Sequence, residues 1–348
     1  MLPDGSSCHY LRRTGQDLVS TGLRELCLYY CNRLSFSEVA KLVERVAGGE
    51  QRLICEQTLW NWAQEKAREV STTLLSEVAA ARSLPLPAVD GAVDIYDACS
   101  EEVLVMSDAI QVKAQKPTRE RAGEPKREKK VKRVSTDLLL LEGQDGSFRH
   151  LCAGLGEEAA SLSEVAQARL RHEWGEHPRP LPVVALTDGA RSIRLMLEGI
   201  FGPSFRVILD WYHLAKKVYQ LLSMVAHGKD ERERMQQGVL GFLWRGGVCE
   251  ALSYLEGVSA RRTEALRELV MYLERHASEI VDYERRAKAG KPIGSGRMEK
   301  AVDRAVGMRQ KKKGMSWSEA GSRALALLKV VELNGEWDGL WEAAPAAA

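Results

Sequence analysis

VLVMSDAIQV (residues 103–112) is an apolar stretch that contains one acidic residue, and its length and composition predict a β-strand. After it, further apolar segments alternate with segments of helical periodicity. In chain order these are the strands STDLLLLEG (135–143) and SFRHLCAGL (147–155), the helix SLSEVAQARLRHEW (161–174), the strand LPVVALTD (181–188), the helix ARSIRLMLEGIF (190–201) and the strand FRVILD (205–210). The predicted order is three strands, a helix, a strand, a helix and a strand.

This order is that of an RNase H-like core, in which the first and fourth strands lie side by side in parallel. We therefore expect an α/β fold with a mixed five-stranded sheet and flanking helices, whose first part is residues 91–213. Residues 214–290 carry only helical patterns and predict an all-helical insertion. The second part of the core, 291–348, opens with GSGRMEKAVDRAVGMRQ (294–310), which predicts one more helix.

Residues 1–90 read as a helical region that ends at the proline-flanked SLPLPAVDG (83–91). Ser35 and Glu38 have the spacing of a capping box, and a Gly-Gly pair ends the helix that they begin. A second helix follows in ICEQTLWNWAQEKAREV (54–70). Two such helices suit a helix-turn-helix whose second helix enters a major groove, although the connection is longer than usual, and a plain helical hairpin is the alternative. The polar residues available for reading bases are Gln57, Thr58, Asn61 and Gln64.

The bulk composition describes a globular protein, since 348 residues at 45% apolar content suffice for one large core or two modest ones. No apolar run has the length of a membrane span, and the N-terminal residues do not resemble a signal peptide, so we expect a cytoplasmic, nucleoid-associated protein without a membrane partner. The seven cysteines are scattered, and Cys27 and Cys31 lie in the apolar LCLYYC. We expect free thiols and helix packing there rather than half of a metal site.

The net charge of +2 does not by itself indicate a nucleic-acid partner, but the distribution of charge does. The arm 113–133 holds ten Lys and Arg against three Glu, and the segment 300–313 holds six against Asp303. Such blocks can neutralise phosphates, although a charge run is more often a solvated face. The basic residues expected to contact DNA are Lys113, Lys116, Arg119, Lys129, Lys130, Arg309, Lys311, Lys312 and Lys313.

Three acids fit a site for phosphodiester chemistry, which uses hard oxygen ligands around two divalent ions. Asp108 and Asp188 each end an apolar strand, and the ends of parallel strands are where ligands bind. Glu299 follows a Gly-Ser-Gly loop that can bring a helix start close to the sheet. Taken singly, an aspartate after a strand is more often a turn or cap residue, whereas the set in this order favours a metal site.

Several segments also resemble the Kra-type insertion-sequence transposases of bacteria, which are distant relatives of the Mutator-like elements. The segments that carry the resemblance are DAIQVKAQKPTRER (108–121), LTDGARSIR (186–194), ILDWYHLAKKVYQLLSMVA (208–226), IVDYERRAKAGKPIGSGRMEKAVDRAVGMRQKKKGMSW (280–317) and LALLKVVELNGEW (325–337). The resemblance implies a DDE-type DNA transposase with an RNase H-like core and a helical insertion before the catalytic Glu. Where members usually read Asp-Gly, this chain has Asp108-Ala109.

Carried over by position, the resemblance makes Asp108, Asp188 and Glu299 the catalytic, metal-binding residues. It implies two Mg²⁺ or Mn²⁺ ions, double-stranded DNA as substrate, and a dimer or larger assembly that holds two transposon ends. Asp210 and His213, in DWYH, resemble an acid-x-x-His signature, to which we assign a structural or DNA-positioning role rather than metal binding. We choose Asp188 over Asp210 as the second ligand because its strand should lie beside that of Asp108.

Two other functions compete with a transposase. An RNase H-like nuclease or resolvase would share the carboxylates but would not need a domain that reads DNA ends. A catalytically inactive or domesticated DNA-binding regulator would keep the DNA contacts alone. Terminal inverted repeats and a target duplication flanking the gene would favour the transposase.

Overall fold

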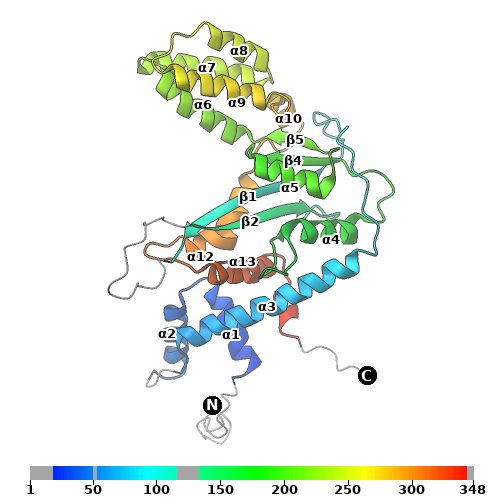
Figure 1. Ribbon diagram of the computed structural model, residues 1–348. Coiled ribbons are helices and arrows are strands. Elements are labelled where there is room, and N and C mark those ends of the chain that lie inside the picture. Colours follow the sequence, from blue (N-terminus) through cyan, green and yellow to red (C-terminus); the bar gives the residue numbers. More distant parts are fainter. Residues whose placement is uncertain (1–18, 50–52, 116–132, 343–348) are drawn as a thin grey trace, which may run out of the picture.

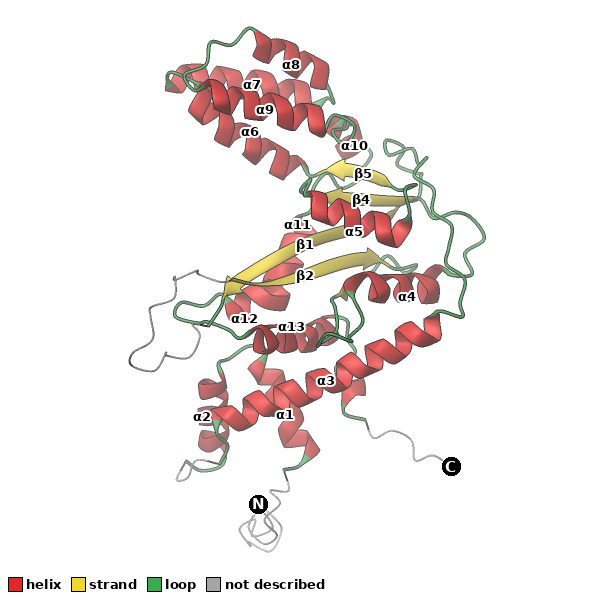
Figure 2. Cartoon of the chain, viewed as in Figure 1, coloured by secondary structure: helices red, strands yellow, loops and turns green. Residues whose placement is uncertain are grey.

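The computed structural model describes residues 19–49, 53–115 and 133–342, and its centre is one five-stranded sheet (Figures 1 and 2). The strands are β1 (Val103–Lys113), β2 (Arg133–Glu142), β3 (Phe148–Leu151), β4 (Val183–Thr187) and β5 (Arg206–Leu209). Their spatial order is β3-β2-β1-β4-β5. β1 runs antiparallel to β2 and parallel to β4, and β5 is parallel to β4. The predicted mixed sheet, with its first and fourth strands paired in parallel, is confirmed.

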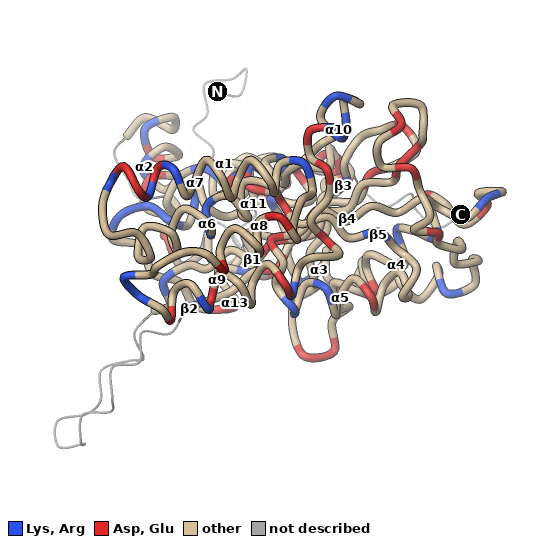
Figure 3. Tube along the Cα trace, turned by 90° about the horizontal axis from the view of Figure 1, so that it is seen from above, with Lys and Arg blue, Asp and Glu red and all other residues tan. Residues whose placement is uncertain are grey.

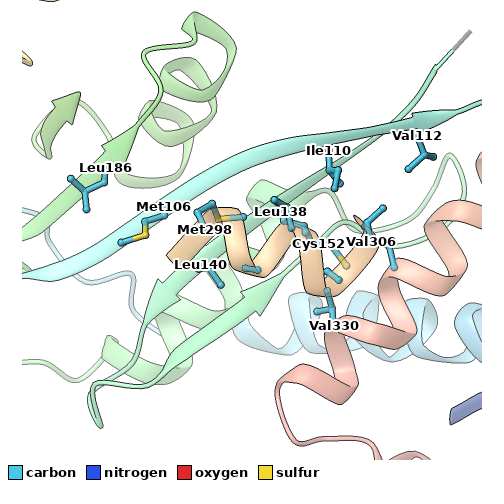
Figure 4. Close-up of a cluster of buried hydrophobic side chains, with 14 of the residues drawn as sticks. Met106, Ile110, Val112, Leu138, Leu140, Cys152, Leu186, Met298, Val306 and Val330 are labelled. Carbon is cyan, nitrogen blue, oxygen red and sulfur yellow. The ribbon is translucent and has the colours of Figure 1, made fainter. Parts of the chain in front are cut away.

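Helices cover both faces of the sheet because alternate residues of each strand point to opposite sides. On one face, Val103 and Val105 pack with α4 (Leu162–Trp174) and α5 (Arg191–Phe201). On the other face, Met106 and Leu186 pack with helices from the C-terminal part of the chain, as Figure 4 shows for Met298 and Val306. These helices are α11 (Gly296–Val302), the π-helical turn η2 (Asp303–Gly307), α12 (Met308–Gln310) and α13 (Glu319–Leu333).

The N-terminal helices extend this second core. They are α1 (Thr21–Cys31), α2 (Phe36–Val46) and α3 (Glu56–Ala81). The expected capping box begins α2, since Ser35 and Glu38 each accept a hydrogen bond from the other's backbone N–H. α3 lies along α13 and α4, and its Leu59, Ala63 and Ala67 are buried in the same cluster as the sheet residues (Figure 1). The helices therefore share one hydrophobic core with the sheet.

The insertion is all-helical over the predicted residues and lies beyond the β5 edge of the sheet (Figure 1). Its helices are α6 (Trp211–Val225), α7 (Lys229–Trp244), α8 (Val248–Glu256), α9 (Thr263–Arg275) and α10 (Tyr283–Lys288). α6 begins three residues before the expected boundary at residue 214, because the Asp210 side chain caps it.

A buried ion cluster fastens the end of the insertion to the start of β1. Arg286, with a side chain that is 0% exposed, donates to both carboxylate oxygens of Glu102 at 2.9 and 2.7 Å. It also donates to the backbone oxygens of Ile95 and Pro292. Lys291 adds a second cation at 2.8 Å from Glu102. The loop that leads from α10 to α11 is therefore held against the sheet by charge-assisted hydrogen bonds.

None of the helices in the described ranges is long and apolar enough to cross a membrane. Within those ranges the cysteines are free thiols, as expected, and Cys27 and Cys31 are buried in the packing of α1. Burial raises the pKa of the Cys27 thiol to about 11, so it stays protonated at neutral pH.

Candidate active site

Three aspartates fall on one line across the parallel part of the sheet. β1 and β4 pair residues that are 80 positions apart, from Val103 with Val183 to Met106 with Leu186. Asp108 and Asp188 each come two residues after the last of these pairs. Asp188 directly follows β4, as expected, whereas Asp108 lies inside β1 and not at its end, because β1 continues to Lys113 in its pairing with β2.

β4 and β5 pair residues that are 22 positions apart, as in Thr187 with Leu209, so Asp210 follows on the same line. Asp188 is therefore the aspartate next to Asp108, and Asp210 lies one strand further out.

Asp108 shows the clearest electrostatic strain of the site. Its half-buried side chain accepts a hydrogen bond from the N–H of Ala109 at 2.7 Å. Burial raises the pKa of Asp108, and the carboxylates of Asp188 and Glu299 raise it further, while His213 lowers it. The acids are thus close enough for their charges to repel one another, and a bound cation would relieve that repulsion.

Glu299 reaches this line from a helix packed on the same face of the sheet. α11 buries Met298, Ala301 and Val302 towards β1 and β2, which leaves the Glu299 side chain exposed. The N–H of Glu299 donates to the Ser295 oxygen at 3.1 Å in the first turn. The π-helical turn η2 follows directly, and such turns are frequent at functional sites.

Asp210 has its lone pairs engaged in hydrogen bonds. It is 1% exposed, and one oxygen accepts the N–H groups of Tyr212 and His213 at 2.6 and 2.9 Å. The other oxygen accepts both the N–H and the hydroxyl of Ser295. Asp210 therefore ties the start of α6 to the loop before α11. This geometry agrees with a bracing role and leaves little room for metal binding.

His213 lies next to Asp210 and within the electrostatic reach of the other acids. Its Nδ1 is 3.6 Å from the Asp210 carboxylate and has no hydrogen-bond partner among the described residues. Asp210 raises the pKa of His213, burial lowers it, and the charges of Asp188 and Glu299 raise it further. The imidazole is therefore biased towards its cationic form beside the acidic line.

The donor chemistry of the site suits a hard divalent cation. Asp108, Asp188 and Glu299 supply carboxylate oxygens, which are the ligands that Mg²⁺ and Mn²⁺ prefer. Among the described residues, however, no three His, Cys, Asp or Glu side chains are grouped tightly enough to form a ready-made metal site. Asp188 also uses one oxygen to accept the N–H of Ala190 at 2.8 Å. The three side chains are thus of the right chemical type for the ion, and metal binding would have to bring their carboxylates closer together.

The residue after Asp188 must be glycine. Gly189 has a φ of +84°, and a Cβ there would lie 2.8 Å from the His276 ring and 2.9 Å from Leu209. His276 cannot easily move, because its ring is buried and hydrogen-bonded to Glu279 at 2.7 Å. The surroundings of Asp188 are thus set by backbone conformation as much as by side chains.

Gly189→Ala is expected to lower the free energy of unfolding by at least about 1–2 kcal/mol, the cost of a left-handed conformation for an L-residue. Gly199→Ala is the matched control, because Gly199 lies in α5 with no atom near its would-be Cβ. That variant should gain about 0.5–1 kcal/mol from helix propensity. Urea unfolding of both variants checks the pair, and equal stabilities would contradict the steric account of Gly189.

Asp210→Asn should destabilise the protein near neutral pH, because an amide NH₂ would face the donors of Ser295. Burial acts to raise the pKa of Asp210, but hydrogen bonds from His213 and Ser295 outweigh it and hold this pKa well below its usual value. The stabilisation that ionised Asp210 gives to the folded protein is therefore complete above the pKa of an aspartate in the unfolded chain, about 3.9. It is lost as the pH falls from there towards the lower pKa of Asp210 in the folded protein.

Unfolding in urea from pH 7 to pH 3 measures this effect. The difference in stability between the wild type and Asp210→Asn should shrink below about pH 4. A difference that stayed constant over this range would contradict an ionised Asp210 in the folded protein.

Comparison with known proteins gives a family for the chain. Residues 159–343 match the sequence model of a family described as Uncharacterised protein family (UPF0236). The chain belongs to this family. Curated proteins show no significant sequence match. The UPF0236 region contains Asp188, Asp210, His213 and Glu299, whereas Asp108 lies before it.

The residues expected to read bases divide into two groups in this UPF0236 member. Gln57 and Asn61 are exposed near the start of α3 and are hydrogen-bonded to each other at 3.0 Å, with Thr58 half-buried beside them. Gln64 is a correction, since it is 4% exposed and its amide faces the Ala320 oxygen. It belongs to the packing of α3 on α13, so it is not placed to touch DNA.

The basic residues also divide. Lys113 and Lys311 to Lys313 are exposed, although Lys312 donates to the Arg33 oxygen at 3.2 Å. Arg309 is a correction, because it is 4% exposed, donates to the Cys31 oxygen at 2.7 Å and lies over the Trp317 ring. Four further residues that are expected to contact DNA lie outside the described ranges, namely Lys116, Arg119, Lys129 and Lys130. Figure 3 shows Lys and Arg interspersed with Asp and Glu over the described chain.

Sequence reasoning missed two parts of the site. The sequence identifies Ser295 only as part of a Gly-Ser-Gly loop that can bring a helix start close to the sheet, whereas Ser295 donates two hydrogen bonds to Asp210. Nothing in the sequence pairs Glu102 with Arg286, which are 184 positions apart. The available signal for Ser295 was local, since a small polar residue between two glycines permits close approach of the backbone.

Proposed function

We propose that this chain is a metal-dependent DNA transposase of the DDE type, with an RNase H-like core, as its resemblance to Kra-type transposases implies. The observation that supports this most is that β1, which holds Asp108, lies beside and parallel to β4, which Asp188 directly follows. The charge of Glu299, from a helix on the same face, acts on the same carboxylate. One carboxylate from each of three elements is the donor set that two-metal phosphodiester chemistry requires.

In this proposal Asp108, Asp188 and Glu299 hold two Mg²⁺ or Mn²⁺ ions. Ions bound there supply an activated water and stabilise the charge that develops on the phosphate. Asp210 positions the loop before α11 through Ser295, and so sets where Glu299 stands. His213, whose pKa the neighbouring acids raise, carries positive charge where a backbone phosphate would approach.

The substrate is double-stranded DNA, first at the ends of the element and then at the target. Gln57 and Asn61 on α3 are exposed for base contacts, while Lys311 and Lys313 are exposed for phosphates. Because two ends are joined in one reaction, the active form is a dimer or a larger assembly on DNA. Its place of action is the bacterial nucleoid.

The test is an in vitro reaction of the full chain with DNA that flanks its gene, in the presence of Mg²⁺, Mn²⁺ or a chelator. We expect strand cleavage at the element end, and joining of the freed 3′-hydroxyl to target DNA, only when metal is present. Binding of the ends without cleavage would indicate a regulator, and cleavage without preference for the ends would indicate a nuclease. Either result would overturn the transposase.

A further inference from the structure

A groove of about 960 Å³ lies beside the helix that carries Glu299. One wall comes from the sheet, with Leu140 and Phe148 among its residues, and the other comes from α11 and η2. Tyr212, in the first turn of α6, lines it too, so the groove opens at the base of the insertion. Figure 2 shows α11 standing next to β1, below the insertion helices.

Three cations line the helical wall of this groove. Arg297, Lys300 and Arg304 have helical spacing that puts them on one face, and all three are exposed. None of them has an ion pair with a carboxylate in the described part of the chain. Glu299 points away from this face, at roughly 100° or more around the helix from each cation. Glu142 also lines the groove, so one carboxylate faces these three cations and the balance of charge is positive. The groove is separate from the acidic line.

Aromatic rings accompany these cations. The Arg297 guanidinium lies 4.4 Å from the centre of the Phe148 ring, which makes a flat, positively charged surface. Tyr212 is 61% exposed, and its ring packs closely on Gly294, where a Cβ would come within 2.5 Å of it. Two turns further along the same face of α6, Tyr219 is 48% exposed. Lys216 lies exposed between the two tyrosines.

We propose that this groove, continued by the face of α6 that carries Tyr212 and Tyr219, binds single-stranded DNA. Cations alone would suit any phosphate backbone, but exposed rings add affinity only where a base has a free face. The bases of a duplex are stacked on both faces, so a paired substrate would leave the rings unused. The choice of DNA over RNA rests on the proposed transposase function, in which one strand separates near the cut.

Fluorescence anisotropy with a labelled oligo-dT and a duplex of equal length tests the groove without any need for cleavage. The triple variant Arg297→Gln/Lys300→Gln/Arg304→Gln should bind oligo-dT at least tenfold more weakly. The salt dependence of its log K should flatten by about 0.7 for each lost contact. The matched control, Arg82→Gln/Lys229→Gln/Arg234→Gln, removes equal charge from exposed sites elsewhere and should bind within about twofold of the wild type.

The rings are tested separately. Tyr219→Ala should weaken oligo-dT binding by about tenfold and duplex binding by less than twofold, whereas Tyr219→Phe keeps the ring and should bind as the wild type does. Equal losses for single strand and duplex would overturn the proposal in favour of a duplex phosphate track. Equal or tighter binding of oligo-U would overturn the choice of DNA.

Binding of a single strand in the groove can be measured separately from the proposed cleavage. Asp108→Asn should bind oligo-dT as the wild type does, so a groove that binds while the wild type fails to cut would overturn only the transposase. A wild type that cuts DNA but binds oligo-dT no better than the triple variant would overturn only the groove.

Discussion

Replacing Asp108 with asparagine is expected to abolish metal-dependent strand cleavage, with a loss of at least about 10³-fold, because each ligand lost from such a site removes charge stabilisation of the transition state. Glu299→Gln should reduce cleavage by a similar factor, because it removes the ligand that α11 contributes. Binding of the DNA ends should stay within a few-fold, since neither side chain has to touch DNA. Gel analysis of cleavage and a parallel binding assay measure the two quantities.

Asp137→Asn is the matched control for Asp108→Asn. Asp137 is an exposed aspartate on β2 that pairs in register with Ala109, one residue from Asp108. The Asp137→Asn variant should cleave DNA as the wild type does. The second ligand is decided in the same assay. Cleavage that survives Asp188→Ala but not Asp210→Ala would reverse the assignment of those two residues.

Glu102→Gln is expected to cost about 3–5 kcal/mol of unfolding free energy, because it leaves two buried cations without their anion. The Arg286 side chain is 0% exposed and that of Lys291 is 9% exposed, so water cannot replace the lost partner. Urea unfolding measures the loss. The control is Glu284→Gln, which breaks an exposed pair with Lys288 and should cost less than about 1 kcal/mol.

A loss below about 1 kcal/mol for Glu102→Gln would contradict the role given to this cluster. The same variant should also impair cleavage, since the loop that the cluster anchors leads to the helix bearing Glu299.

The strands and helices of the core were predictable because each apolar run is short, is bounded by turn residues and has a clear period. The pairing of β1 with β4 followed from the element order alone. The line through Asp108 and Asp188 depends on the register between two strands 80 positions apart, which local pattern does not specify.

The burial of Gln64 and Arg309 was missed for a related reason. Both residues are polar and sit in segments with exposed neighbours, so their surroundings depend on which distant helix packs against them. α13 covers Gln64, and the end of α1 meets Arg309. Long-range packing of this kind is visible only in three dimensions.

The packing of α3 against α13 constrains how a bound DNA end would be presented for cutting. α3 is 26 residues long, which corresponds to about 39 Å of rigid rod. Gln57 and Asn61 lie at one end of this helix. Buried residues along the rest of α3 pack into the same hydrophobic core as β1, the strand that holds Asp108. If these residues recognise DNA, the distance between the recognition sequence and the cleaved bond is therefore constant. Insertion or deletion of base pairs between the two should then displace or prevent the cut, with no compensation by a swinging domain.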